Sequence, residues 1–383
     1  MRLYLVRRTR SFIRTNYAKF DAARDRHYLT FADGTKSYFP IREPKTVKFA
    51  IRDGNADDQY ARLFSKEVVD IVNQLRLPRY GMGNYVAPTP RDPPSPKEDL
   101  HLRNLSRAGK RLMGFCRTNL FKRLESSGHS FIQSVERHIL RNFVFVYALR
   151  NGLQVPLGTQ DVGVFDSRID DADAEGRIGG FDRFEDDGAG ETEADTSPPR
   201  DEQGFLAAAK GIYDEYERRY KARFVWLRPD LFIGQLADDL LSDARDLLRV
   251  LGIGGEWRAA SDAKLLSLLE LVRIRHPTEK VLVFSQFADT IRYLERELAR
   301  SGVESVAGVT GDTDDPTRQA WRFSPESNDK ATQFGNDQIR VLLATDVLSE
   351  GQNLQDCAIV VNFDLPWAII RLIQRAGRVD RIG

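Results

Sequence analysis

The sequence predicts an α/β protein that ends in a mostly parallel sheet and begins with a largely helical region containing a small β-hairpin segment. Short apolar runs at 281–284, 339–344 and 359–363 each end in a polar turn, which is typical of buried parallel strands. In the front part, apolar residues recur at helical spacing over 98–151. Apolar and polar residues alternate around Asp33-Gly34, a dipeptide that favours a hairpin turn.

The hairpin is expected to join strands near residues 28–32 and 35–40, and a third run at 46–51 is expected to pair alongside. Between the two long helices, Ser126-Ser127-Gly128 predicts a break. Leu236 to Leu251 predicts a further packing helix.

Composition excludes several classes of protein. The chain has 383 residues, 41% of them hydrophobic, and no apolar run approaches the roughly 18 residues of a membrane span. The N-terminus lacks a long apolar segment and a small-residue cleavage site, so a secretory signal is not expected. With two cysteines and five scattered histidines, we expect neither a disulfide framework nor a metal site. A reducing cytoplasm fits this composition best.

Charge is distributed unevenly along a chain whose formal net charge is +1. Residues 1–150 hold about 29 basic and 14 acidic side chains, whereas residues 161–203 hold about 4 basic and 15 acidic ones. The basic part indicates a polyanionic partner, although a solvated surface balanced elsewhere in a larger protein would give the same count. The acidic part predicts a disordered linker, or a strip that competes with DNA for the basic surface.

Three arginines close the sequence at spacings of three, on either side of Gly377. Arg375, Arg378 and Arg381 present guanidinium groups of the kind that stabilises charge on a phosphoryl group during transfer. Ligands of open α/β sheets bind at the carboxyl ends of the strands, so we expect the site there. The structural alternative is a solvated helix face that carries three arginines.

Four motifs occur in order in the last part of the chain. They read Val281-Leu-Val-Phe-Ser-Gln-Phe287, Thr310-Gly-Asp-Thr313 followed by Arg318, Thr345-Asp-x-x-Ser-Glu-Gly-Gln-Asn-Leu-Gln355, and Gln374-Arg-x-Gly-Arg-x-x-Arg-Ile-Gly383. Together they resemble the second, RecA-like motor lobe of Snf2-like ATPases in helicase superfamily 2, and most of all the bacterial, RNA-polymerase-associated members.

The resemblance implies roles for individual residues. Contacts to nucleic acid would come from Ser285, from the turn containing Thr310, Gly311 and Thr313, and from Thr345. Gly351, Asn353 and Arg375 would border the nucleotide. Arg378 and Arg381 match the arginine fingers of the family, with Gln374 beside them as a catalytic residue. Without the resemblance, Ser285 is unremarkable at a strand end, and the loop after residue 344 is an ordinary βα loop with capping groups.

The resemblance also covers the front of the chain. Residues 117–127 resemble the helical protrusion of the family, in which Arg117, Lys122 and Arg123 are candidates for contact with the DNA backbone. A helical hairpin with a solvated basic face is the alternative. The expected domains are 1–97 (the end of the first-lobe linkage with hairpin and helix), 98–160 (protrusion), 161–203 (acidic insertion), 204–256 (linking helices) and 257–383 (RecA-like lobe).

The triphosphate cradle has no counterpart in the sequence. No Gly-x-x-x-x-Gly-Lys-Ser/Thr motif occurs, and no Asp-Glu-x-His block follows an apolar strand. The expected cofactor, ATP with Mg²⁺, would therefore be held mainly by an absent first lobe, and the chain alone is not expected to hydrolyse ATP.

The function predicted from these motifs is the C-terminal part of an ATP-dependent DNA translocase. The expected partner is double-stranded DNA, with RNA polymerase or another protein complex as a second partner and no membrane. A non-enzymatic nucleic-acid or partner-binding module that keeps only the second lobe is the alternative. An RNA-directed relative of the superfamily is a third reading, and stimulation by duplex DNA or by RNA would separate it from the first.

Overall fold

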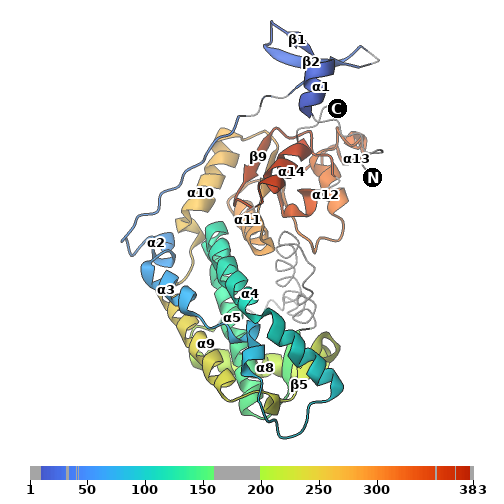
Figure 1. Ribbon diagram of the computed structural model, residues 1–383. Coiled ribbons are helices and arrows are strands. Elements are labelled where there is room, and N and C mark those ends of the chain that lie inside the picture. Colours follow the sequence, from blue (N-terminus) through green and yellow to red (C-terminus); the bar gives the residue numbers. More distant parts are fainter. Residues whose placement is uncertain are drawn as a thin grey trace.

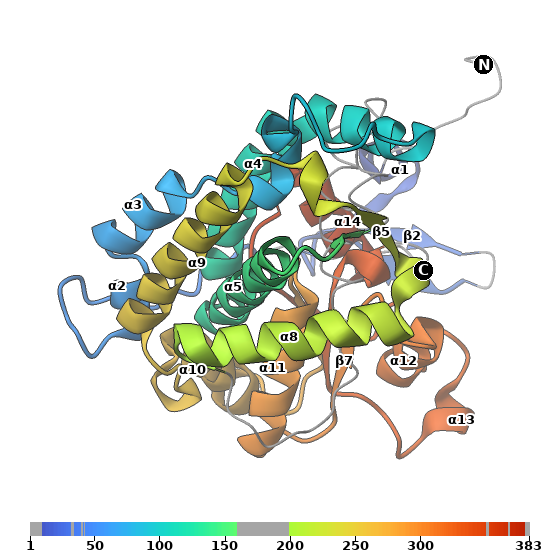
Figure 2. The same cartoon turned by 90° about the horizontal axis from the view of Figure 1, so that it is seen from below.

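The structure is a computed structural model, which describes residues 10–31, 34–39, 41, 43–158, 199–349, 352–366 and 368–379. Most of the predicted acidic insertion, together with Gly351 and Arg381, lies outside these residues. Figure 1 shows an α/β lobe formed by the last part of the chain, a helical body formed by the middle part, and a small antiparallel sheet near the N-terminus. Figure 2 shows α8 and α9 of the helical body from below.

The lobe is built on a parallel four-stranded sheet in the order β7-β8-β6-β9. Its strands are β6 (Val281–Phe284), β7 (Val306–Val309), β8 (Val341–Ala344) and β9 (Ile359–Asn362). Every residue of β6 and β8 is buried, which explains why these two strands are apolar throughout instead of alternating. The predicted α/β class with a parallel sheet in the last part is confirmed.

Helices cover both faces of this sheet, and each face has its own hydrophobic core. The helices of the lobe are α10 (Ala263–Glu270), α11 (Ala288–Arg300), α12 (Pro316–Phe323), α13 (Ala331–Phe334) and α14 (Ile369–Val379). Val281 and Val283 of β6 pack with α10 and α11, whereas Leu282 and Phe284 pack on the other face with α12. Successive residues of β6 thus serve opposite cores.

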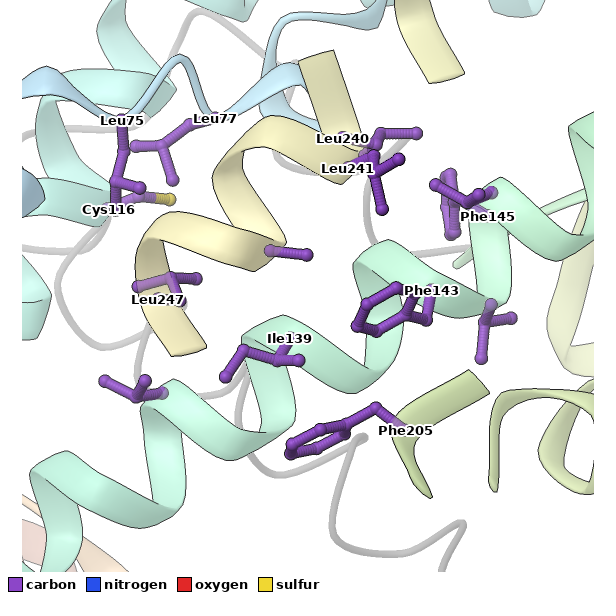
Figure 3. Packing of buried hydrophobic residues seen from close by; sticks show 14 of the residues in the cluster. Leu75, Leu77, Cys116, Ile139, Phe143, Phe145, Phe205, Leu240, Leu241 and Leu247 are labelled. Carbon is purple, nitrogen blue, oxygen red and sulfur yellow. The ribbon is translucent and has the colours of Figure 1, made fainter. Parts of the chain in front are cut away.

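The helical body consists mainly of six helices packed around one core. They are α2 (Gln59–Leu63), α3 (Lys66–Gln74), α4 (Pro96–Ser126), α5 (Gly128–Arg150), α8 (Glu202–Arg219) and α9 (Gln235–Gly254). Figure 3 shows Phe143 and Ile139 of α5 between Leu240 and Leu247 of α9 and Phe205 of α8. The helix α4 begins with a capping box, in which Ser95 and Glu98 each accept a hydrogen bond from the other's backbone N–H.

Two small antiparallel sheets complete the fold. The first contains β1 (Lys19–Asp21), β2 (Arg26–Thr30) and β3 (Lys36–Tyr38), and the second pairs β4 (Val155–Gly158) with β5 (Phe224–Leu227). The predicted hairpin is thus present as β2 and β3. The expectation of a third strand at 46–51 is wrong: that segment is not in a strand, and β1 pairs with β2 instead, across a short turn. Of the helices that the structure describes, none has the length and apolarity to cross a membrane.

Gly128, the first residue of α5, lies where the helical body meets the lobe. A Cβ atom at this position would lie 2.3 Å from two ring atoms of Trp257. We therefore expect Gly128→Ala to lower the free energy of unfolding by about 1–3 kcal/mol, because the indole ring must shift. Gly211→Ala, in the middle of α8, is the matched control. It meets nothing within 4 Å and should raise stability by about 0.5–1 kcal/mol, as measured by urea unfolding.

Candidate functional site

The predicted nucleic-acid contacts lie along one edge of the parallel sheet. Val309, Ala344, Phe284 and Asn362 are register partners across the four strands. The residues that follow them begin the loops at the carboxyl edge, and they include Thr310, Thr345 and Ser285. Parallel strands of equal register therefore place three of the predicted residues side by side, although they are far apart in the sequence.

Ser285 lies inside the protein at the end of β6. Its side chain is fully buried, and its hydroxyl donates a hydrogen bond to Oδ2 of Asp364 at 2.5 Å. The backbone N–H of Phe287 donates to the Ser285 hydroxyl oxygen at 3.2 Å. In this arrangement the hydroxyl faces Asp364 instead of solvent, so its contact with nucleic acid stays a prediction.

A buried cluster of hydroxyl groups joins Ser285 to the break between α4 and α5. Ser126 donates to Oδ2 of Asp364 at 2.6 Å, and its oxygen lies 2.9 Å from the hydroxyl of Thr290 on α11. Ser130 of α5 lies 2.9 Å from the same hydroxyl. Lys264 of α10 donates to the carbonyl oxygen of Ser126 at 2.8 Å. We call this contact between the helical body and the lobe the junction.

Arg123 belongs to the junction and not to an exposed basic face. Its side chain is 4% exposed and its Nη1 lies 2.7 Å from Oδ2 of Asp289 on α11. The guanidinium also lies over the ring of Phe287, 4.8 Å from the centroid. Arg137 of α5 forms a second ion pair with Asp289. In this arrangement the guanidinium of Arg123 is not exposed, because it pairs with Asp289 within the fold. Its contact with DNA stays a prediction.

The other two candidates on α4 are only partly exposed. Arg117 donates from Nη2 to the carbonyl oxygen of Leu75, and its Nε is buried without a hydrogen-bond partner among the described residues. Lys122 is half-buried. Of the basic residues that predict a contact surface on α4, Arg117 therefore points into the helical body. Sequence could not show this, since the carbonyl that binds Arg117 is 42 residues away.

The turn after β7 is tight and lies at the surface. Thr310 donates its backbone N–H to the hydroxyl oxygen of Thr313 at 2.9 Å, and Gly311 is exposed. Arg292 of α11 holds the next residue, Asp312, through an ion pair of 2.9 Å. An exposed glycine in a turn braced at both ends permits a close approach by another backbone or a phosphate. The nucleic-acid role of this turn stays a prediction.

The loop after β8 contains two buried polar atoms that have no partner among the described residues. The backbone N–H of Thr345 donates to the carbonyl of Val309 at 3.0 Å, while its side-chain hydroxyl is buried and unpaired. Asn353 donates from Nδ2 to the carbonyl of Ser327 at 2.7 Å, and its Oδ1 is buried and unpaired. Buried polar atoms without partners are uncommon, and two of those found in the described residues lie in the predicted loop.

Arg375 is fully buried beneath α14. It donates from Nε to Asp346 at 2.6 Å, and from Nη1 to the side-chain oxygen of Asn362 at 3.0 Å. Its guanidinium lies over the ring of Phe284 at 5.1 Å. Arg371 donates to the other oxygen of Asp346 at 3.1 Å. In this arrangement Arg375 links α14 to the loop after β8, and its contact with nucleotide stays a prediction.

The remaining predicted residues of α14 lie along the same helix. Gln374 and Arg378 are half-buried, and the backbone N–H of Leu354 donates to the carbonyl of Arg378 at 3.2 Å. The ion pair of Arg375 with Asp346 therefore holds the helix that carries Arg378 against the loop that follows Thr345. In the part of the chain that the structure describes, no cluster of three or more His, Cys, Asp or Glu side chains could hold a metal ion.

Comparison with known families adds to this geometry. The family model described as helicase conserved C-terminal domain matches residues 263–383, which contain the whole parallel sheet and α14. This part of the chain is a helicase C-terminal domain. The match begins at the first residue of α10 and so leaves the helical body outside the family model.

Two relatives of known sequence each match a third of the chain or less. The uncharacterized ATP-dependent helicase YqhH of Bacillus subtilis (strain 168) is 33% identical over 126 residues, 33% of this chain and 20% of the relative. The probable ATP-dependent RNA helicase ddx17 of Dictyostelium discoideum is 35% identical over 105 residues, 27% of this chain and 12% of the relative. The chain thus matches a fifth or less of the length of these two relatives.

The comparison with solved structures gives two matches of low TM-score. The crystal structure of the C-terminal part of the Fun30 ATPase domain is 14% identical with a TM-score of 0.29, covering 66% of this chain and 77% of that one. The Pyrococcus furiosus Hef helicase domain is 18% identical with a TM-score of 0.26, covering 65% and 51%.

Several residues of the site are absent from the sequence-based prediction. Asp364 directly follows the predicted run at 359–363, so its place at a strand end could have suggested it. Asp346 is within the quoted motif, although its pairing with two arginines of α14 is visible only in the structure. The pairing of Ser126 with Thr290 and of Asp289 with Arg123 gives no signal in the sequence, because each pair is more than a hundred positions apart.

Proposed function

We propose that this helicase C-terminal domain is the second motor lobe of a Snf2-like ATPase that translocates on double-stranded DNA. The observation that carries the proposal is the link between Arg375 and Asp346. It holds the helix of the predicted arginine fingers against the loop that follows Thr345, a predicted nucleic-acid contact. The carboxyl edge of the parallel sheet would then present arginines to a nucleotide and small polar residues to a nucleic-acid backbone.

ATP with Mg²⁺ is the proposed cofactor, held mainly by a first lobe. The bound nucleotide would supply the phosphoryl group that is transferred. Arg378 and Arg381 would stabilise the charge on the phosphates from this lobe, and Gln374, Gly351 and Asn353 would border them. Asn353 fits such a role because its Oδ1 is buried without a partner among the described residues. Arg375 would act through Asp346, as a positioning residue.

Proposed movement of the nucleic acid follows from this arrangement. When the two lobes close on ATP, the turn of Thr310, Gly311 and Thr313 and the loop of Thr345 would shift together along the backbone, because one sheet carries them both. Association with RNA polymerase or another complex, and a cytoplasmic location, belong to the same proposal. The association rests on the resemblance of the four motifs to bacterial Snf2-like proteins, and the location rests on the composition of the chain.

A second candidate substrate is RNA. It is favoured by the names of relatives such as the DEAD-box ATP-dependent RNA helicase 35B of rice (Oryza sativa subsp. japonica), which is 34% identical over 122 residues, 32% of this chain and 18% of the relative. The four motifs, which end with the Gln-Arg-x-Gly-Arg stretch, resemble those of Snf2-like proteins. We therefore propose DNA as the first candidate substrate and RNA as the second.

ATP turnover in the presence of different polymers tests the proposal. The purified chain should show no turnover above background with duplex DNA, duplex RNA or no polymer. When a first lobe with a phosphate-binding loop is joined to the chain, duplex DNA should raise turnover and duplex RNA should not. Stimulation by RNA alone would assign the lobe to the second candidate. Turnover by the chain alone would contradict the need for a first lobe.

A further inference from the structure

The three-stranded sheet near the N-terminus has one strongly basic face. Lys19, Tyr28 and Tyr38 are direct register partners across β1, β2 and β3, so they lie on the same face. Alternation along each strand adds Arg26 and Lys36 to that face. Figure 1 shows this sheet at the end of the molecule that also carries α14, away from the helical body.

Aromatic rings hold two of the cations in place. Nζ of Lys36 lies 4.7 Å from the centroid of the Tyr28 ring, and the guanidinium of Arg24, from the turn between β1 and β2, lies 5.0 Å from that of Tyr38. The Tyr38 hydroxyl donates to Asp21 at 2.7 Å, which fixes the ring. Lys36 and Arg24 are therefore positioned by cation–π contacts. Asp21 shares this face as the register partner of Arg26.

The four basic side chains of this face are open to solvent. Lys19, Arg24, Arg26 and Lys36 are all exposed, and none of them is in an ion pair within the described residues. Over residues 10–52 the sequence has ten Lys and Arg against four Asp and Glu, so the surrounding segment does not neutralise them. Arg123 of α4 differs from these four residues, because its guanidinium is buried in an ion pair with Asp289. The basic excess of the front part is accessible on this sheet.

We propose that this basic face is a second binding surface for duplex DNA, separate from the edge of the parallel sheet. A duplex carries about one negative charge per 1.7 Å of its axis, so a patch of four exposed cations that outnumber the carboxylate of Asp21 matches its backbone. Single strands fit less well, because Lys36 and Arg24 cover the ring faces on which bases would stack.

The surface would tether the chain to the duplex on which the motor is proposed to act. In this respect the inference deepens the proposed function. It does not need ATP or a first lobe, however, so binding of DNA by the chain alone tests it independently of turnover. Contacts to phosphates carry no sequence information, and the surface should therefore bind duplexes of different sequence equally.

The test compares two triple variants of the full chain. Lys19→Gln/Arg26→Gln/Lys36→Gln removes three cations from the sheet. Lys97→Gln/Lys210→Gln/Lys221→Gln removes the same charge from exposed positions of the helical body. Binding of a short labelled duplex is followed by fluorescence anisotropy over a series of salt concentrations without ATP, and circular dichroism checks that both variants fold.

We expect the sheet variant to weaken binding about tenfold and to reduce the salt slope by about 2 to 3, since each phosphate contact contributes about 0.9. The control variant should bind nearly as tightly as the native chain. Equal binding by the sheet variant and the native chain would overturn the inference. So would a loss confined to duplex RNA or to anionic phospholipid vesicles, because either result would assign the face to another partner.

Discussion

We expect Asp289→Ala to lower the free energy of unfolding by about 3 kcal/mol or more, because the substitution removes the carboxylate that pairs with the buried guanidinium of Arg123. Arg137 loses its partner as well. The effect should be measurable as a lower urea midpoint. Asp246→Ala is the matched control, since Asp246 pairs with the exposed Arg249 on one helix and should change stability by about 0.5 kcal/mol or less.

The same carboxylate predicts a dependence of stability on pH. Burial raises the pKa of Asp289, but the charges of Arg123 and Arg137 outweigh burial and hold this pKa well below its usual range. The contribution of Asp289 to the free energy of unfolding is therefore complete above the unfolded-state pKa of about 4. It is lost as the pH falls below that value. The difference in stability between the native chain and Asp289→Ala should shrink in acid. A difference that grows on acidification would contradict the buried ion pair.

Arg375→Ala is the second substitution with a large expected effect. The guanidinium is fully buried and binds Asp346 and Asn362, so its removal should lower the free energy of unfolding by about 2–3 kcal/mol. Arg371→Ala removes the more exposed partner of Asp346, and should lower it by about 1 kcal/mol or less. Urea unfolding of both variants measures the difference.

Nucleotide binding separates the two roles considered for Arg375. If Arg375 only positions α14, then Arg375→Ala should lower the free energy of unfolding. Any loss of nucleotide affinity would then result from displacement of the helix. A variant that folds with native stability but binds nucleotide more weakly would show that Arg375 contacts the nucleotide directly. That outcome would restore the contact implied by sequence resemblance.

The sequence was sufficient for three of the four strands of the parallel sheet, whereas β7 (Val306–Val309) was not predicted. Strands β6 and β8 are buried on both faces, so their apolar runs were unambiguous. Polar residues at the ends of predicted strands then placed Ser285 and Thr345 on one edge, because parallel strands share their direction. Thr310 was predicted only through the resemblance of its turn to the family motif. The helix break at Ser127 followed from its small polar residues and the adjoining glycine.

The surroundings of individual arginines could not be predicted. Arg123 and Lys122 are adjacent in a basic stretch, yet only the structure shows that Arg123 faces Asp289, 166 residues away. Arg375 and Arg378 have the same spacing pattern in the motif, yet Arg375 is buried against Asp346 and Arg378 is only half-buried. Spacing places a side chain on a helix face, but the partner opposite that face comes from tertiary structure.

The most direct measurement of the central claim is DNA-stimulated ATP turnover with Arg378→Ala, in the chain joined to a first lobe. An arginine that stabilises the phosphates in transfer should be worth on the order of 10³-fold in rate. We therefore predict a loss of that size, with the urea midpoint and affinity for duplex DNA close to those of the native protein. Turnover that is unchanged by Arg378→Ala would contradict the assignment of this helix to phosphoryl transfer.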